Sequence, residues 1–471
     1  MRVLLTVHQF FPDFSAGTEV LTRSTALELM RRGHEVCIFS GHPSPSNVTS
    51  YHHHGIRVER HSPAPRAQQH PSVMAWGSDN LLANAQFARL LRDFQPDVVH
   101  YFHLNRLGVG LIDQATQVGL LQTLTPTDFW NLCPTGQLMY PGGQTCTGPD
   151  SFGGNCIQHL ASTQTRGMAR QLVRALPIGF FNKTAKICLK YSGGSYIKDS
   201  NTLAVAQRLP RHIRALNQLH RILAPNTMMQ RSLQQHGVHP HLLEKMAYGI
   251  DLPPQPSPPP FRSYDPQRPL VLGFIGTLAA HKGCHVLLQA LQQLQDQSSL
   301  VAVQLRIYGA SYEFPAYYQS LTATAGQLTE PIQVEFCGTF PNSHIHQTLC
   351  ALDALVVPSV WVENNPLVIY SAQAAACPVI ASDLPGMSDA LQHNHNGLLF
   401  AAANARALAQ QIKRLWDEPS LLQHLSRNAQ PPKSIGTYTD DLLGIWAGED
   451  AARPHGQAPT TAAAGAAVRP A

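Results

Sequence analysis

The chain has 471 residues, of which 44% are hydrophobic and 13% are charged, a composition that excludes a disordered protein and predicts two or three globular domains. Its formal net charge of +5 is too small to indicate a nucleic-acid partner, so we expect no nucleic acid to bind. No apolar run approaches the roughly twenty residues of a spanning helix, and the chain begins with a strand pattern rather than a secretory signal. The nine cysteines are odd in number and favour a reducing cytoplasm over a disulfide framework.

The first half of the chain, residues 1–251, alternates buried strands with amphipathic helices. This alternation predicts an open, mostly parallel α/β sheet. We expect strands at 2–10, 34–40, 56–60, 97–102 and 120–125, and helices at 18–32, 78–93 and 108–118. The run from His52 to His54 reads as a surface loop rather than as a set of metal ligands. No Gly-x-Gly-x-x-Gly pattern follows the first strand, so a dinucleotide site is not supported there.

A loop that contains a glycine, FFPDFSAGTE at residues 10–19, follows the first expected strand. Gly17, with Thr18 beside it, would let the backbone approach a phosphate or a sugar closely. The same glycine would also suit a simple turn, and the sequence leaves both interpretations open.

A long irregular stretch, residues 128–159, is rich in cysteine, and loops of this length are usually functional. Its Cys-x12-Cys-x9-Cys-x2-His pattern would suit a tetrahedral structural zinc site, whose ligands would be Cys133, Cys146, Cys156 and His159. Free thiols in a reduced loop, or a disulfide, fit the same residues. The sequence leaves these alternatives open.

A basic helical insert is predicted at residues 160–220. Between residues 157 and 231, twelve Lys or Arg residues stand against a single acidic residue, Asp199. Leu, Ile and Phe are mixed with these bases at residues 166–190, a composition that suits a helix resting on an anionic membrane surface. A solvated helix face would carry the same charges, so this alternative stays open.

The second half of the chain repeats the alternation after a proline-rich stretch. Residues 252–269 hold eight prolines and read as a stiff linker. Strands are expected at 271–276, 303–308, 334–338, 354–358 and 378–381, and helices at 284–294 and 316–325. We predict a second domain at residues 270–430, a last helix at 431–448 and a disordered tail at 449–471.

The stretch from Val356 to Ser382 organises this second domain as strand, loop, helix and strand. In such a unit ligands bind beyond the carboxyl ends of the strands. The helix opens near Asn365 and Pro366, where unpaired N–H groups suit a phosphate. Glu363, just before the helix, would repel a phosphate and is better suited to accept hydrogen bonds from hydroxyl groups. A phosphate next to hydroxyls indicates a nucleotide-sugar, although a solvated loop carboxylate is the simpler alternative.

A second phosphate-binding candidate is the loop GFIGTLAAHKG at residues 273–283. Gly276 would allow close approach of the backbone, and Lys282 would supply a compact cation, as a diphosphate requires. A lysine at the start of a surface helix would look the same in the sequence.

Residues 356–382 resemble the donor-site signature of the retaining glycosyltransferases of family 4, which have the GT-B fold. The resemblance covers residues 1–446 and implies two Rossmann-like α/β domains facing a cleft. The acceptor side would be residues 1–251, and the donor would bind residues 270–430. The last helix, at 431–448, would cross back to the first domain.

The resemblance also implies a reaction. A hexose would move from a UDP- or GDP-sugar to a glycan or lipid-linked saccharide with retention of configuration, in polysaccharide or cell-envelope biosynthesis. Catalysis would require no cofactor, because Lys282 and helix N-termini would stabilise the leaving diphosphate. The protein would be cytoplasmic, or peripheral on the inner face of the membrane.

Site residues follow from the same resemblance. Glu363 would contact the transferred sugar, and Asp128 with Thr127 would occupy the catalytic positions of the first domain. The loop at Gly17 and Thr18 would meet a phosphate or the acceptor. The donor would be bound by Gly276, Lys282, Gly338, Phe340, Asn365, Pro366, Leu367 and Ser371.

Two departures from the family pattern oppose activity. The family usually has His where this chain has Thr127, and a second Glu where it has Ser371. On the ribose, a Ser hydroxyl contributes roughly 1 kcal/mol against ~2–3 for a carboxylate, which lowers donor affinity about ten- to thirtyfold. Loss of a general acid or base would lower the rate by a further factor of roughly 10²–10⁴. The alternative prediction is therefore an impaired or inactive family member that binds sugar-nucleotides or acts as a scaffold.

Overall fold

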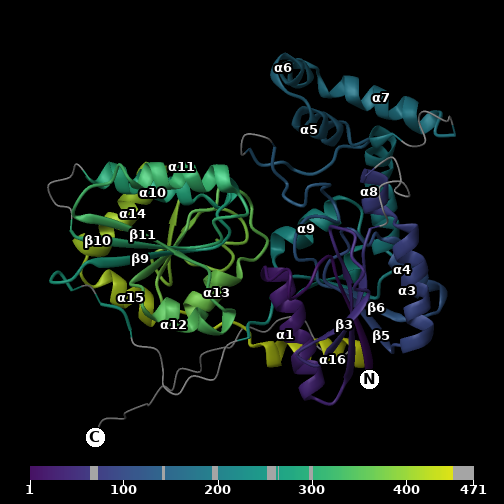
Figure 1. Cartoon of the computed structure of the whole chain (residues 1–471), viewed down its shortest axis with the longest axis horizontal. Coiled ribbons are helices and arrows are strands. Elements are labelled where there is room, and N and C mark those ends of the chain that lie inside the picture. The colour runs from purple at the N-terminus through teal and green to yellow at the C-terminus, as the bar shows by residue number, and fades with distance from the viewer. Residues whose placement is uncertain are drawn as a thin grey trace, which may run out of the picture.

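The computed structural model describes residues 1–63, 73–140, 144–193, 200–251, 261–263, 265–295 and 301–448. Two lobes stand side by side, each with a central β-sheet between layers of helices (Figure 1). The predicted pair of Rossmann-like α/β domains is confirmed. Most of the linker predicted at 252–269, and the whole tail predicted at 449–471, lie outside the described residues.

The first sheet has eight strands within the described ranges, in the order β3-β4-β2-β1-β5-β6-β7-β8. The strands are β1 (Arg2–Val7), β2 (Glu35–Gly41), β3 (Ser50–His53), β4 (Ile56–His61), β5 (Val98–Tyr101), β6 (Leu121–Leu124), β7 (Arg221–Ala224) and β8 (Leu243–Lys245). Only β3 runs antiparallel to its neighbour. The central strands are buried on both faces, which explains their continuous apolar sequences.

The surface loop expected at His52 and His53 is wrong, because both residues lie in β3 and pair with β4. The alternation of half-buried and exposed side chains along β3 is that of an edge strand. His53 stacks on Phe11, with ring centres 5.1 Å apart. Histidines replace the β-branched residues that usually mark a strand, so the sequence pattern concealed it.

Helices cover both faces of the first sheet. One face packs on α1 (Gly17–Arg31) and α16 (Ile435–Ala447). The other face packs on α3 (Leu81–Phe94), α4 (Gly110–Gln117), α8 (Asn201–Leu216) and α9 (Thr227–Gln235). Short helices α2 (Val73–Ser78) and η2 (Pro240–Leu242) complete this region.

The second sheet is entirely parallel, with six strands in the described residues and the order β11-β10-β9-β12-β13-β14. They are β9 (Leu270–Ile275), β10 (Val303–Tyr308), β11 (Ile332–Gly338), β12 (Ala354–Val357), β13 (Val379–Ser382) and β14 (Leu398–Phe400). One face carries α10 (Cys284–Gln295), α11 (Pro315–Ala325), α14 (Ala405–Asp417) and α15 (Leu421–Arg427). The other carries α12 (Ile345–Cys350) and α13 (Leu367–Ala374), while η3 (Ala280–Lys282) and η4 (Asn342–His344) lie in loops.

Helix α16 follows the second domain in the sequence but packs against the first domain (Figure 1). The Tyr438 hydroxyl lies 2.9 Å from the Thr125 hydroxyl, and the Trp446 indole N–H donates to Thr123 Oγ1 at 2.9 Å. All four side chains are buried or face the first sheet. The chain therefore crosses between the domains twice.

An excursion from the first domain contains α5 (Gly154–Gln164), α6 (Gly167–Ala175) and α7 (Ile178–Lys190). The cysteine-rich stretch was expected to be irregular through residue 159, but α5 begins at Gly154. Asp150 explains this start, since its carboxylate accepts the N–H of Gly154 at 2.7 Å. Cys156 and His159 consequently lie on a helix. In the part of the chain that is described, no helix is long and apolar enough to cross a membrane.

Candidate active site

A cavity of about 510 Å³ lies between the two domains, at the carboxyl ends of their strands. His8 follows β1, Asp128 follows β6, Gly276 follows β9 and Ser359 follows β12, and all four line the cavity. The site is thus built from four strand ends and the start of helix α13.

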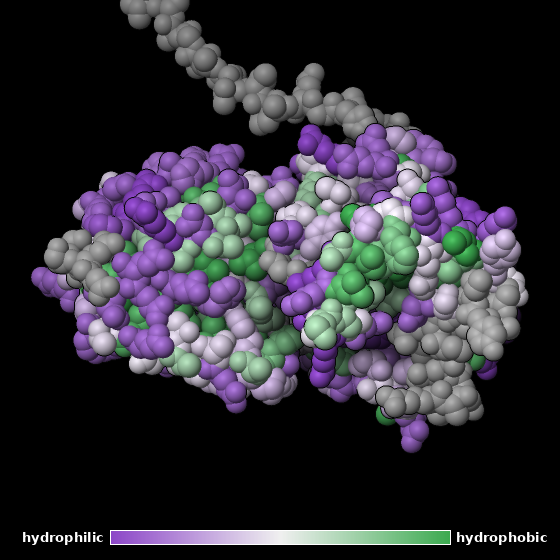
Figure 2. Space-filling model, turned by 90° about the horizontal axis from the view of Figure 1, so that it is seen from above, coloured by the Kyte–Doolittle hydropathy of each residue, from purple (hydrophilic) through white to green (hydrophobic). Residues whose placement is uncertain are grey.

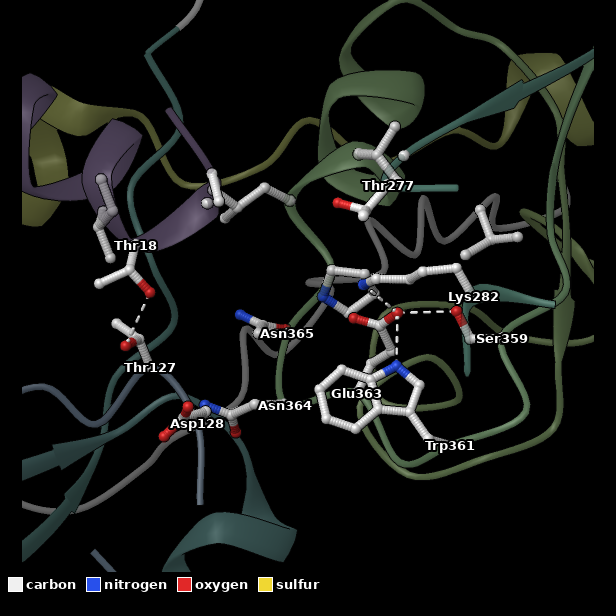
Figure 3. Close-up of a pocket in the computed structure, with 18 of the residues that line it drawn as sticks. Thr18, Thr127, Asp128, Thr277, Lys282, Ser359, Trp361, Glu363, Asn364 and Asn365 are labelled. Atoms are coloured by element: carbon white, nitrogen blue, oxygen red, sulfur yellow. Dashed lines mark hydrogen bonds and ion pairs between the residues drawn. The ribbon is translucent and has the colours of Figure 1, made fainter. Parts of the chain in front are cut away.

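Glu363 is the centre of the second-domain wall (Figure 3). Its Oε1 atom accepts a hydrogen bond from Lys282 Nζ at 2.6 Å. The Ser359 hydroxyl donates to the same oxygen at 2.7 Å, and the Trp361 indole N–H at 3.2 Å. Only 7% of Glu363 is exposed, so neither a solvated carboxylate nor a free surface lysine describes this pair.

Charge pairing sets the ionisation of this wall. Burial alone would raise the pKa of Glu363, but the cation of Lys282 and the hydrogen bonds to the carboxylate hold that pKa below its ordinary value. Burial, together with the charge of Lys282, lowers the pKa of His281 to about 4. At neutral pH the Glu363 carboxylate of this wall is therefore ionised, and the neighbouring imidazole of His281 is neutral.

Two close backbone approaches fix the loops of this wall. A Cβ at Gly386, where φ is +86°, would lie 1.9 Å from the carbonyl oxygen of Glu363. A Cβ at Gly283, where φ is +75°, would lie 1.8 Å from the carbonyl oxygen of Pro358. Only glycine fits either position, so both loops are held by backbone contact.

Asn364 joins this wall to the first domain. Its Nδ2 donates to the carbonyl oxygen of Pro126 at 3.0 Å and to the Tyr248 hydroxyl at 2.7 Å. The side-chain amide of Asn226 donates to the carbonyl oxygen of Asn364. Because Asn364 directly follows Glu363, contact with the first domain holds the loop that carries the carboxylate.

The N-terminal end of α13 faces the cavity through Asn365, Pro366 and Leu367. No side chain caps this end of the helix. The Tyr370 hydroxyl donates to Asn365 Oδ1 at 2.6 Å and holds that side chain against the helix. The uncapped N–H groups and the positive end of the helix dipole favour an anion here.

Residues 15–19, at the end of the first-domain loop and the start of α1, form part of the opposite wall (Figure 3). The Thr18 hydroxyl donates to Thr127 Oγ1 at 2.9 Å. A Cβ at Gly17 would lie 3.5 Å from Leu367 Cδ1, so the loop packs closely on α13. The two walls therefore meet at this loop.

Four titratable side chains form a continuous cluster behind this wall. His103 Nε2 lies 3.0 Å from Asp128 Oδ2. The rings of His103 and His8 are 4.1 Å apart between centres, and His8 Nε2 lies 3.7 Å from Glu19 Oε1. Burial lowers the pKa of His8 well below its ordinary value and raises the pKa of Glu19. His8 therefore presents a neutral imidazole to the cavity.

The two segments of chain that supply the walls of the cavity each match a known family. The model of the family "Glycosyl transferase 4-like domain" matches residues 16–249, and that of the family "Glycosyl transferases group 1" matches residues 261–431. The chain belongs to the group 1 glycosyltransferases, with a family 4-like first domain. Both matched segments contribute residues to the cavity.

Curated relatives of this glycosyltransferase match it in part. WcaL of Escherichia coli (strain K12), which carries the name of a colanic acid biosynthesis glycosyltransferase, is 28% identical over 185 residues, 38% of this chain and 43% of WcaL. The 2-deoxystreptamine glucosyltransferase of Streptomyces kanamyceticus is 31% identical over 150 residues, 32% of this chain and 37% of that enzyme. The chain therefore spans less than half the length of these relatives.

Solved glycosyltransferases share the whole fold. Anabaena HepE, crystallised in complex with UDP-glucose, matches with a TM-score of 0.61 and 15% identity, over 95% of this chain and 100% of HepE. The predicted GT-B fold is confirmed. At this low sequence identity, the similarity shows a shared fold alone.

Most site residues proposed from the sequence come together in this glycosyltransferase. Those that line the cavity are Gly17, Thr18, Thr127, Asp128, Gly276, Lys282, Glu363, Asn365, Pro366 and Leu367. Gly338, Phe340 and Ser371 do not line it. The Ser371 hydroxyl donates to the carbonyl oxygen of Leu367 at 3.1 Å, and the Phe340 ring packs edge-on against Tyr308, with centres 5.3 Å apart. Their contact with a nucleotide stays a prediction.

Sequence reasoning missed several residues of the site, among them His8, Glu19, Ser359, Trp361 and Asn364. Ser359 stands just beyond the expected carboxyl end of β12, so the rule for strand ends would have found it. His8 lies inside the strand expected at 2–10, which ends at Val7 in the structure. Trp361 and Asn364 flank Glu363 in the sequence. Trp361 donates to Glu363 two positions away, whereas the partners of Asn364 lie far along the chain, where no local pattern indicates them.

The proposed zinc ligands Cys133, Cys146, Cys156 and His159 line one small pocket of the glycosyltransferase, away from the cavity. All nine cysteines are free thiols, so the disulfide interpretation is wrong for this structure. Across the described ranges, no three His, Cys, Asp or Glu side chains are arranged to hold a metal ion. Cys133 Sγ instead contacts the Thr135 hydroxyl at 3.2 Å. The zinc assignment stays a prediction.

Proposed function

We propose that this glycosyltransferase moves a hexose from a UDP- or GDP-sugar to a glycan or lipid-linked saccharide, with retention of configuration. The observation that carries the proposal is the pair of Lys282 and Glu363 beside the N-terminal end of α13. A nucleotide-sugar requires a cation and free N–H groups for its diphosphate, and acceptors for its sugar hydroxyls. All of these groups lie on one wall of the cavity.

UDP-glucose is the first donor to consider, because HepE shares the fold and was crystallised with it. Its diphosphate would compete with Glu363 for Lys282 on entering the cavity. As the bond between the sugar and the phosphate breaks, negative charge grows on the leaving oxygen, and Lys282 and the end of α13 would stabilise it. Glu363, released from its partner, would accept hydrogen bonds from the sugar hydroxyls.

The acceptor would bind against the first-domain wall. The neutral imidazole of His8 can accept a hydrogen bond from an acceptor hydroxyl at the cavity surface. This imidazole lines the same cavity as Thr127, the position where the family usually has His. The proposed place of the reaction is the cytoplasm, at the inner face of the membrane, where lipid-linked saccharides would be met.

An inactive, nucleotide-binding or scaffolding homologue is the second candidate. The orientation of Ser371 favours it, because the hydroxyl is bonded within α13 rather than directed into the cavity. A double change, Thr127→His with Ser371→Glu, separates the candidates. Transfer or donor hydrolysis that appears only in the double variant would identify the natural chain as inactive. Turnover by the natural chain would identify it as an enzyme.

Calorimetric titration of the full chain with UDP, GDP and ADP tests the proposal. We expect saturable binding of UDP or GDP, and at least a tenfold loss in Lys282→Ala. Lys413→Ala is the matched control, since Lys413 lies in the same domain and pairs with Asp417 on the surface of α14. Absence of binding to all three nucleotides, in a chain that is folded by circular dichroism, would reject the donor site.

A further inference from the structure

Helices α6 and α7 form a hairpin that stands away from both sheets (Figure 1). Helix α6 packs on α5 and has no buried residue of its own. Helix α7 packs on α5 and α8 through one side, where Phe181 and Ala185 are buried. The outer side of the hairpin faces away from the rest of the chain. We call this outer side, residues 166–191, the hairpin surface.

Large apolar side chains gather on the hairpin surface. Met168 and Leu172, one helical turn apart on α6, are 86% and 65% exposed. Phe180 and Ile187, two turns apart on the outer side of α7, are at least half exposed. Of the fourteen large hydrophobic residues exposed in the described chain, six lie between residues 168 and 191. Scattered exposed apolar residues are ordinary, but such a concentration indicates an interaction site.

The charge of the hairpin surface has a single sign. No Asp or Glu occurs between residues 151 and 193. The basic residues of this stretch are Arg166, Arg170, Arg174, Lys183, Lys186 and Lys190. On α7, Lys183 and Lys190 share the outer side with Phe180 and Ile187, because residues three, four and seven apart lie on one helical face. Figure 2 shows apolar side chains here, bordered by hydrophilic ones.

We propose that the hairpin surface docks on an anionic phospholipid membrane. Apolar side chains interleaved with lysines match the boundary between acyl chains and anionic headgroups, where both kinds of group are satisfied. A second copy of the chain would bring like charges together. A nucleic acid would form ion pairs with the Arg and Lys side chains, but it would leave Met168, Leu172 and Phe180 in water. A lipid surface accommodates the charges and the apolar side chains together.

Docking would orient the molecule. The hairpin belongs to the first domain, and one segment of chain leads from Asp128, at the cavity, to α5 at its base. The first-domain wall would therefore face the lipid more closely than the donor wall does. Docking itself does not depend on the transfer reaction.

Vesicle flotation of the full chain tests the proposal. The probes are vesicles of phosphatidylcholine alone and of phosphatidylcholine mixed with phosphatidylglycerol, at low and at high salt. We expect flotation with the anionic vesicles only, weakened by salt. Leu172→Gln with Phe180→Gln, and separately Lys183→Gln with Lys190→Gln, should each lower the bound fraction at least tenfold.

Matched control variants lie on α3 of the same domain. Leu81 is 74% exposed there, and Arg89 and Arg92 are exposed bases. Leu81→Gln, and Arg89→Gln with Arg92→Gln, should float like the natural chain. Equal binding to neutral vesicles, no binding to either kind, or equal losses in hairpin and control variants would each overturn the proposal. Retention on immobilised polyglutamate without flotation would also overturn it, in favour of an acidic protein partner.

Discussion

The two walls of the cavity differ in how their charged and titratable side chains are arranged. The second-domain wall pairs opposite charges, since Glu363 accepts three hydrogen bonds and one of them comes from Lys282. In the first-domain wall, burial shifts two pKa values in opposite directions, lowering that of His8 and raising that of Glu19. The contrast indicates that one wall is suited to bind a charged ligand and the other to handle a proton.

The largest expected effect comes from breaking the charge pair without changing its shape. Glu363→Gln keeps the volume of the side chain but removes the charge that Lys282 pairs with. We expect the transfer rate to fall by a factor of roughly 10²–10³, with nucleotide affinity within a fewfold, because Lys282 remains available to the diphosphate. Initial rates and calorimetry measure the two quantities. Glu335→Gln, on an exposed position of β11, is the control, and an undiminished rate in Glu363→Gln would remove this residue from the proposed role.

The opposite wall is tested through its imidazole. His8→Ala should lower the transfer rate by about ten- to a hundredfold while leaving the dissociation constant of UDP unchanged. The pH profile of the transfer rate separates a chemical role of His8 from a structural one. Loss of a chemical role would change the shape of the profile, whereas loss of a structural role would leave that shape unchanged. His34→Ala, at the N-terminal edge of the same sheet, is the control. A parallel loss of UDP affinity in His8→Ala would mean that His8 also contributes to nucleotide binding, which would contradict separate roles for the two walls.

The contact between the walls has a smaller effect. Asn364→Ala removes two donated hydrogen bonds in a buried site and leaves the Asn226 amide with fewer acceptors, which costs about 1–3 kcal/mol. The midpoint of thermal unfolding should fall by roughly 2–4 °C for each kcal/mol. Asn428→Ala provides the comparison, since that amide donates to the carbonyl of His424 at the end of its own helix. Equal shifts in both variants would contradict the coupling of the domains through Asn364.

The smallest expected effect is on stability at acid pH, which tests the pairing of Lys282 with Glu363. The folded-state pKa of Glu363 lies below its ordinary value of 4.5, so the pair stabilises the fold fully above about pH 4.5. That contribution is lost as the pH falls through the lowered pKa. Between about pH 5 and pH 3, the thermal midpoint of Glu363→Gln should therefore fall less steeply than that of the natural chain. Parallel curves would show that the pair contributes nothing to stability.

Much of the fold was predictable because its signals are local. The strand at residues 303–308 was placed exactly, and α10 and α13 were found within a few residues, since buried parallel strands and amphipathic helices leave short-range patterns. Glu363 and Lys282 were recognised as site residues for the same reason. Their direct contact, across 81 positions of sequence, was not predictable. His103 escaped notice because its partner, Asp128, lies 25 positions along the chain, in the loop after the next strand.

The double crossing of the chain decides which segment can be exchanged between relatives without disturbing a core. Helix α16 completes the core of the first domain, although it is encoded after the second. A recombination event that exchanged everything after residue 251 would pair a foreign α16 with the native sheet at Thr123 and Thr125. An exchange of the interior segment between residues 252 and 434 would leave that core intact. Interior replacement would therefore exchange the second domain while the two ends of the chain, which share one core, come from one parent.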